Sequence, residues 1–212
     1  MTVAESLGES GSPIANFPVA DHEATRRRLT ARQAEAVATL VQAAERETEE
    51  VGYAGLTVRG VARRAGVAPA TAYTYFSSKD HLLAEVLWRR MEALPPVDAD
   101  LSVPVADRVA RTVQDMIPFA AQSPALIDAC TVALISSSPD VSHLRDRIGA
   151  QTHRRLTAAL GPDVDPRVVR VLEAAYSGAL LTAGIGHMSF VDVPAFVAEA
   201  ATLLVEGTGG GR

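Results

Sequence analysis

Cysteine and lysine are almost absent: the 212-residue sequence has one of each, Cys130 and Lys79. A lone cysteine excludes an intramolecular disulfide and a multi-cysteine zinc site, and it is typical of a reducing cytoplasm. The first twenty residues contain acids and prolines and lack the basic start and apolar run of an export signal. We therefore expect a cytoplasmic protein.

Long uncharged runs are scarce as well. The one candidate for a membrane span is 174–191, which has no Asp, Glu, Lys or Arg. It is about the minimum length for a span, but its Gly, Ser, Thr and His residues fit a helix buried by protein better. Hydrophobic residues make up 48% of the chain and charged residues 21%, which supports a packed core and excludes a disordered polyelectrolyte. We expect no membrane partner.

Catalytic and cofactor motifs are also missing. The sequence has no Gly-x-Ser-x-Gly elbow, no His-Glu-x-x-His pair and no phosphate-binding Gly-Lys loop. Gly184 and Gly186 match only the first two glycines of a dinucleotide fingerprint, and they follow a helical pattern. The Asp-x-Asp sequences at 98–100 and 163–165 fit loops and helix caps better than metal ligands. We expect no enzyme: no catalytic residue, no cofactor and no metal.

Charge is divided unevenly along the chain. Residues 1–25 carry four acids and no bases, residues 26–91 carry eleven bases and seven acids, and residues 92–212 carry nine bases and fourteen acids, within a net charge of −5. A basic segment in an acidic protein indicates a region that meets an anion. Scattered surface charge is the alternative explanation.

Helical patterns run through most of the sequence, and no segment shows the sustained alternation of a strand, so the fold is predicted to be all-α. A capping side chain followed by proline marks three helix starts, at Ser123-Pro124, Ser138-Pro139 and Asp165-Pro166. The predicted helices begin with one that starts at a capping box, Thr30 to Gln33, and ends at Gly52 and Gly55. The others are 58–65, 69–75, a helix capped by Ser77 or Ser78 that runs to Leu94, 105–122 with a kink at Pro118, 124–135, 139–160, 166–186 and 194–205.

The helices between residues 56 and 94 are short and their turn signals are tight. Thr57 can cap the helix 58–65, Gly66 supplies a turn, and Pro69 starts the next helix. Two short helices that are joined by a glycine turn and braced by longer helices form a helix-turn-helix.

The same segment resembles the signature of TetR-type transcriptional repressors. The resemblance is carried by Leu56-Thr57, Ala62-Arg63-Arg64-Ala65-Gly66-Val67, Thr71-Ala72-Tyr73-Thr74-Tyr75-Phe76 and Lys79-Asp80, and it spans roughly residues 30–91. It implies a three-helix helix-turn-helix DNA-binding domain at 29–94 and a larger helical ligand-binding and dimerisation domain at 95–207. Composition predicts a disordered leader with a basic arm at 1–28 and a flexible, glycine-rich tail at 208–212. The partners that the resemblance implies are double-stranded DNA, a second copy of the chain and a small effector.

Side chains around the second short helix favour DNA binding on chemical grounds too, because cationic and hydroxyl groups make most contacts to phosphate oxygens. Lys79 lies in the first turn of a helix, where its charge opposes the helix dipole, so a bound phosphate explains it better than helix stability does. Arg59 can bridge O6 and N7 of guanine or can contact a phosphate. The candidate DNA-binding residues are Arg59, Ala68, Pro69, Ala70, Thr71, Tyr73, Tyr75 and Lys79.

Two positions depart from the family pattern. Ala68 replaces the usual capping serine, at a cost of about 1 kcal/mol in helix initiation, and Ala70 stands where glycine is frequent. In addition, the arginines at 26–28 precede the first helix, either as an arm that enters the minor groove or as a solvated patch.

A single short recognition helix reads only a few base pairs, so a dimer on a palindrome is expected. The predicted interface lies on the last two helices, which in TetR-type proteins pair across the two-fold axis; a monomeric core is the alternative. Its residues are Val168, Leu172, Ala175, Ala179, Ala183, Phe196, Val197, Ala200 and Leu204.

Apolar residues of the remaining helices line either a ligand pocket or a plain core. A pocket of this composition favours a hydrophobic effector. Its predicted lining is Met116, Phe119, Ile127, Cys130, Leu134, Leu144, Ile148, Tyr176 and Leu180, with Gln114, Gln151 and His187 as further polar groups. The function predicted from the whole sequence is a repressor released by its effector; a corepressor-dependent repressor or activator, and a broad multidrug sensor, are the alternatives.

Overall fold

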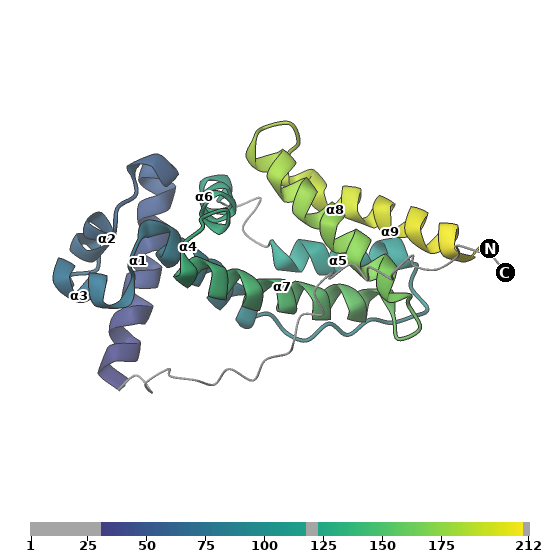
Figure 1. The fold of residues 1–212 in the computed structure, drawn as a ribbon, viewed down its shortest axis with the longest axis horizontal. Helices are drawn as coiled ribbons and strands as arrows, with labels where there is room; N and C mark the ends of the chain where they lie inside the picture. The colour runs from purple at the N-terminus through teal and green to yellow at the C-terminus, as the bar shows by residue number, and fades with distance from the viewer. Residues whose placement is uncertain (1–30, 118–122, 210–212) are drawn as a thin grey trace, which may run out of the picture.

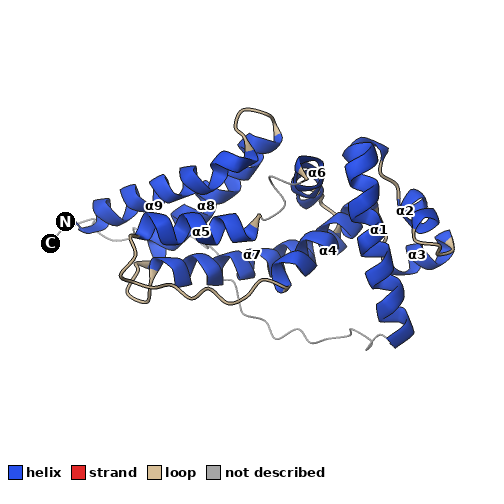
Figure 2. Cartoon of the chain, turned by 180° about the vertical axis from the view of Figure 1, so that it is seen from behind, coloured by secondary structure: helices blue, strands red, loops and turns tan. Residues whose placement is uncertain are grey.

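The computed structural model describes residues 31–117 and 123–209, and these residues form nine α-helices and one short 3₁₀ helix, with no strand among them (Figures 1 and 2). The predicted all-α fold is confirmed. The helices are α1 Ala31–Gly55, α2 Val58–Arg64, α3 Pro69–Tyr75, α4 Lys79–Glu92, α5 Val105–Met116, α6 Pro124–Leu134, α7 Pro139–Leu160, α8 Pro166–Gly184 and α9 Val193–Gly209, with η1 at Phe190–Asp192 before α9.

The predicted bounds of α3 and α7 are confirmed, and two other predictions are wrong. Helix α5 does not continue through a kink at Pro118, because Ile117 already has non-helical dihedral angles (φ −126°, ψ 50°). A residue before proline is pushed out of the α region by the proline ring. Helix α9 passes its predicted end at Val205, and Thr208 donates hydrogen bonds to carbonyl oxygens in its last turns. The capping box at Thr30 and the arginine arm lie outside the described residues.

Only some of the helix caps that the sequence predicts form hydrogen bonds in the structure. Thr57 accepts a hydrogen bond from the Gly60 amide at 2.9 Å, and Ser78, one of the two predicted caps, accepts from the His81 amide at 3.0 Å. Of the three residues before proline, Asp165 caps α8, whereas Ser123 and Ser138 make no capping bond. Ser138 has nearly the same backbone dihedral angles as Asp165, so the backbone conformation does not explain the difference.

The helices form a head and a body, which we define by the elements they contain. The head holds α1, α2 and α3, and the body holds α5 to α9. Two helices join the head to the body: α4 packs against α1 and against α6 and α7, and α1 itself packs against α6. Figure 1 places α2 and α3 at one end of the molecule and α8 and α9 toward the other. One continuous core of buried apolar side chains runs through both parts.

Gly66 makes the turn between α2 and α3 with a φ of +66°, a conformation that is strained for any residue with a side chain. Gly66→Ala is therefore expected to lower the free energy of unfolding by about 1 kcal/mol. Gly149, a helical glycine of α7 with open space around its Cα, is the matched control, and Gly149→Ala should raise stability by about 0.5–1 kcal/mol. Urea unfolding followed by circular dichroism measures both; equal effects would contradict the strained turn.

Cys130 lies on α6 with its side chain fully buried, and its Sγ donates to the Leu83 carbonyl oxygen at 3.6 Å. Burial raises the pKa of this thiol to about 12, because the thiolate would lose its solvation. The thiolate is the reactive form, so we expect labelling at pH 8 to be slower in the folded than in the unfolded protein by on the order of a hundredfold or more. Equal rates with a disulfide reagent in buffer and in guanidinium would contradict this burial.

Candidate nucleic-acid interface

Helices α2 and α3 pack against each other, and backbone hydrogen bonds close the turn that joins them. Val58, Val61 and Ala62 of α2 are buried, and the Val67 amide donates to the Ala62 carbonyl at 2.9 Å. Helix α3 buries one residue of its seven, Ala72, which has no exposed surface. Tyr75 is partly buried against the core, and the other five residues of α3 are exposed.

The structure brings the predicted DNA-binding residues to this outer side of the head. Tyr73 is 53% exposed, although tyrosine has a large ring that would be buried in an ordinary helix contact. None of the predicted residues is buried: the exposed ones are Arg59, Ala68, Pro69, Ala70, Thr71 and Tyr73, and the partly exposed ones are Tyr75 and Lys79. Helix α3 begins without a side-chain cap at Ala68, as the sequence indicates. That these eight residues contact DNA stays a prediction.

The arginines of α2 divide into two groups. Arg64 forms ion pairs with two acids of α1, Glu47 at 2.5 Å and Glu50, and these hydrogen bonds raise its pKa. Arg59 and Arg63 are exposed, and no ion pair to either was found among the described residues. They stand four residues apart, which places them on one face of the helix. Arg63 was not among the predicted residues, although its spacing from Arg59 could have identified it.

Lys79 has a structural partner that the sequence did not reveal. Its Nζ donates to the Tyr53 carbonyl oxygen at 2.8 Å and lies 3.9 Å from the centre of the Tyr53 ring. The Tyr53 hydroxyl donates to Asp80 at 2.8 Å, and burial, with this hydrogen bond, raises the pKa of Tyr53 to about 12. The contacts with Tyr53, near the end of α1, therefore explain the position of Lys79 as well as a bound phosphate would. An ammonium group has three N–H donors, so Lys79 can donate to Tyr53 and to a phosphate at the same time.

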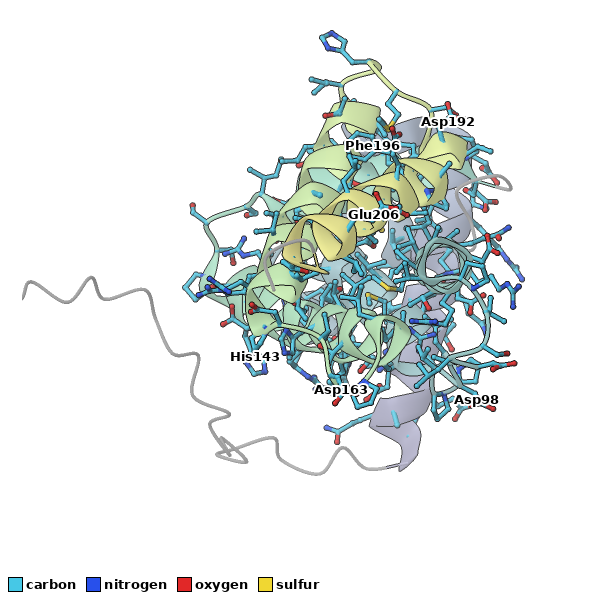
Figure 3. All side chains as sticks on the ribbon, turned by 90° about the vertical axis from the view of Figure 1, so that its right-hand side faces the viewer. Asp98, His143, Asp163, Asp192, Phe196 and Glu206 are labelled. Atoms are coloured by element: carbon cyan, nitrogen blue, oxygen red, sulfur yellow. The ribbon has the colours of Figure 1, made fainter. Side chains whose placement is uncertain are left out.

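The structure places most of the predicted dimer residues within the chain's own core. Val168, Leu172, Ala179, Ala183 and Val197 are buried, and Ala175, Ala200 and Leu204 are partly buried. Phe196 is the exposed member, at 42%, and it lies on the outer side of α9 together with Glu206 (Figure 3). The predicted face of α8 is thus the face that packs against the rest of the same chain, so we revise the proposed interface.

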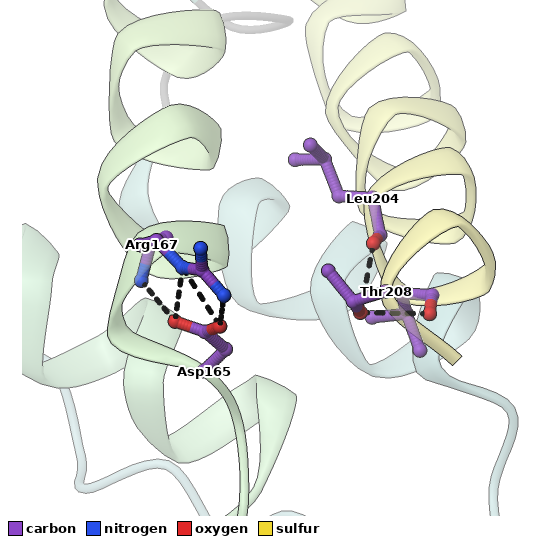
Figure 4. Close-up of polar contacts among 5 residues, drawn as sticks. Asp165, Arg167, Leu204 and Thr208 are labelled. Carbon is purple, nitrogen blue, oxygen red and sulfur yellow. Dashed lines mark hydrogen bonds and ion pairs between the residues drawn. The ribbon is translucent and has the colours of Figure 1, made fainter. Parts of the chain in front are cut away.

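A second apolar stripe of α8 faces outward. Its spacing alternates between three and four residues, the pattern by which two helices pack along their length. The stripe consists of Val171, Ala174, Gly178, Leu181 and Ile185, all exposed, and exposed Phe196 and Leu203 continue it on α9. Polar contacts mark one end, where Asp165 pairs with Arg167 beside the last turn of α9 with Thr208 (Figure 4). We call these seven residues the outer stripe.

The predicted pocket residues lie in the interior of the body. Met116, Ile127, Cys130, Leu144, Ile148 and Tyr176 are buried, Leu134 and Leu180 are partly buried, and Phe119 lies outside the described residues. Of the predicted polar groups, Tyr176 is buried, which raises the pKa of its phenol, whereas Gln114 and His187 are exposed and Gln151 accepts a bond from Arg154. The Ser123 hydroxyl is a buried polar group that the sequence assigned to a cap, and it has no partner among the described residues.

Two surface hollows occur elsewhere, and the predicted pocket residues line neither of them. A hollow of about 420 Å³ lies between α4 and α7, where Arg147 stacks on Trp88 with its Cζ 4.0 Å from the ring centre. A hollow of about 170 Å³ lies along α5 and the segment before it. Within the described residues, no group of three or more metal-ligating side chains was found, and no helix is long and apolar enough to cross a membrane.

A short helix with an outward polar face, joined by a glycine turn to a basic helix and carried on a helical body, defines a helix-turn-helix transcriptional regulator. Residues 40–86 match the family described as bacterial regulatory proteins, tetR family. An uncharacterized HTH-type transcriptional regulator of Mycobacterium tuberculosis H37Rv is 44% identical over 170 residues, which cover 79% of each chain. The chain belongs to the tetR family.

Solved structures agree with this fold. The crystal structure of a TetR transcriptional regulator from Rhodococcus sp. RHA1 matches with a TM-score of 0.68 at 22% identity, over 84% of this chain and 98% of that chain. The structure of the transcriptional regulator FadR from Bacillus subtilis in complex with stearoyl-CoA matches with a TM-score of 0.55 at 19% identity, over 80% of this chain and 98% of that chain.

Proposed function

We propose that this transcriptional regulator is a repressor that binds a palindromic operator as a homodimer and leaves it when a small hydrophobic effector binds. The observation that carries the proposal is the outward face of the head, where Arg59 of α2 and Thr71 and Tyr73 of α3 are exposed while Ala72 anchors α3 in the core. Guanidinium and hydroxyl groups on a helix-turn-helix are suited to phosphate oxygens and to base edges in the major groove.

The dimer follows from the size of the head and from the outer stripe. Helix α3 has seven residues, too few to read more than a few base pairs, so specific binding needs a second head on a second half-site. Large apolar side chains left exposed in one patch mark interaction sites. The outer stripe supplies such a patch, at the end of the molecule away from α3 (Figure 1).

The effector site is proposed among the buried apolar residues of the body. Met116, Ile127, Leu144 and Tyr176 come from four different helices, α5 to α8, so a molecule inserted between them would shift helices relative to one another. Tyr176 and Ser123 would bind its polar part. A fold neighbour, FadR from Bacillus subtilis, was crystallised in complex with stearoyl-CoA, and this supports the choice of an apolar effector. An effector changes operator affinity only by its differential affinity for the two states, and operator DNA weakens effector binding by the same factor.

Footprinting on the DNA that flanks the gene tests the proposal. We expect the purified protein to protect an inverted repeat, with an affinity that falls steeply with salt because each phosphate contact releases counterions. Apolar compounds that raise the melting temperature of the protein are expected to release the DNA. A folded dimer that binds flanking and random genomic fragments equally, at low salt and with or without such compounds, would refute the proposed repressor.

A further inference from the structure

Asp140, in the first turn of α7, contacts the loop between α3 and α4, although 63 residues separate it from Ser77 in the sequence. Its Oδ2 accepts a hydrogen bond from the Ser77 hydroxyl at 2.7 Å. The same oxygen lies 3.8 Å from Nδ1 of His81, and that nitrogen is 3.3 Å from the Ser77 hydroxyl. A carboxylate of the body is therefore hydrogen-bonded to Ser77 and lies near His81, at the beginning of α4; both Ser77 and Asp140 are exposed.

The Ser77 and His81 side chains are tied closely to the end of α3. Phe76, which follows the last residue of α3, is buried, and its amide donates to the Ala72 carbonyl at 2.9 Å. The rings of Phe76 and His81 meet edge to face, 5.4 Å apart. The Ser77 amide reaches His81 Nδ1 at 3.4 Å. At most two contacts therefore separate Asp140 from the last turn of α3.

The start of α7 is a firm support for this contact. Val141 is fully buried in the body core, and Pro139 fixes the backbone of the first helical position. Asp140 also carries its negative charge at the positive end of a helix, where that charge is favourable. The acceptor that holds Ser77 is therefore part of the body and not of the head.

We propose that Asp140 is a positioning residue for α3: it fixes the orientation of the head on the body, and so the spacing of the two heads in a dimer. The inference rests on the proposed binding of a palindrome by a homodimer. A head whose reading helix is less firmly oriented can still bind one half-site. Two heads must reach two half-sites at once. If their orientation is not fixed before binding, the entropy lost when binding fixes it weakens the affinity for the palindrome.

The test compares two duplexes, the footprinted palindrome and the same length of DNA with a single half-site, at low salt. Asp140→Ala is expected to weaken palindrome binding by at least about fivefold, the lower end of ordinary coupling between sites, and to leave half-site binding within about twofold. Asp140→Asn keeps an acceptor for the Ser77 hydroxyl and should retain most of the affinity. Asp146→Ala removes an exposed acid from the same helix and serves as the control without effect.

A double-mutant cycle assigns the effect to the contact itself. Ser77→Ala combined with Asp140→Ala should be no weaker on the palindrome than Asp140→Ala alone, since both remove the same hydrogen bond. Equal losses on both duplexes, no loss on either, or an Asp140→Asn variant as weak as Asp140→Ala would overturn the proposal.

Hydrogen exchange of the free protein separates this inference from the proposed function. Asp140→Ala is expected to speed exchange of the amides from Phe76 to Ser78 relative to Asp140→Asn, which loses the same charge at the start of α7 but keeps an acceptor for Ser77. Wild-type protein that binds neither duplex would refute the proposed function, and unchanged exchange in that loop would independently refute the role of Asp140.

Discussion

Arg59→Ala is expected to reduce the preference for the operator over random DNA by roughly 5- to 150-fold, which corresponds to the 1–3 kcal/mol of a bidentate contact to guanine. Arg59 is exposed in the first turn of α2, and no acid within the described residues was found to pair with it. Its guanidinium is therefore available to DNA without the loss of a structural contact. Equilibrium binding to operator and random duplexes over a range of salt concentrations measures the effect.

Two further variants distinguish contacts with bases from the sequence-independent electrostatic attraction of the protein to DNA phosphates. Lys79→Ala should weaken binding to operator and random DNA alike, and it should lower the slope of log affinity against log salt concentration by about 1. A melting curve must accompany this variant, because Lys79 also donates to the Tyr53 carbonyl oxygen. Arg111→Ala removes the same charge from an exposed position on α5 and should leave binding to both kinds of DNA unchanged. If Arg59→Ala and Lys79→Ala behave alike, Arg59 contacts phosphate and the reading of sequence belongs to α3.

Gly178→Arg is expected to abolish the dimer and to weaken operator binding by about 10²- to 10⁴-fold, the gain that two linked sites ordinarily provide. Gly178 is an exposed helical glycine in the middle of the outer stripe, and a Cβ built on it would meet nothing within 4 Å in its own chain. A single chain can therefore accept the larger side chain. Two chains that pack on this stripe cannot, because a long charged side chain would lie between the helices.

The control for this variant is Gly149→Arg, at a helical glycine of α7 that is equally exposed and equally free of neighbours. Analytical ultracentrifugation should find Gly149→Arg dimeric and Gly178→Arg monomeric, and circular dichroism should find the same helical content in both. A Gly178→Arg protein that stays dimeric and binds its operator normally would place the interface elsewhere.

Helix α8 shows why the sequence does not distinguish the face that packs within the chain from the face that the structure leaves exposed. Its residues form two apolar stripes, one that includes Leu172 and Ala179 and one that includes Val171 and Leu181. Both stripes have helical spacing, so the sequence alone does not distinguish them. Burial does: Leu172 has no exposed surface, whereas Val171 is 51% exposed. The choice between them depends on where α7 and α9 pack against α8, which is a long-range property.

The head could be predicted in greater detail because its signals are local. The bounds of α3 and the cap at Thr57 depend on residues within a few positions of each other. The contacts of Lys79 with Tyr53, of Arg64 with Glu47 and of Ser77 with Asp140 join residues 26, 17 and 63 positions apart. No spacing rule predicts such pairs, since they arise only when separate helices meet.

Selection from a pool of random duplexes tests the central claim most directly, because it needs no knowledge of the operator's location. The purified protein is incubated with the pool, bound DNA is recovered and sequenced, and the selection is repeated with the Arg59→Ala and Gly178→Arg variants. We predict an inverted repeat for the wild type, degenerate positions within each half for Arg59→Ala, and loss of the paired repeat for Gly178→Arg. Recovery of no enriched sequence, or of a single unpaired site by the wild-type protein, would contradict a dimeric reader of palindromic DNA.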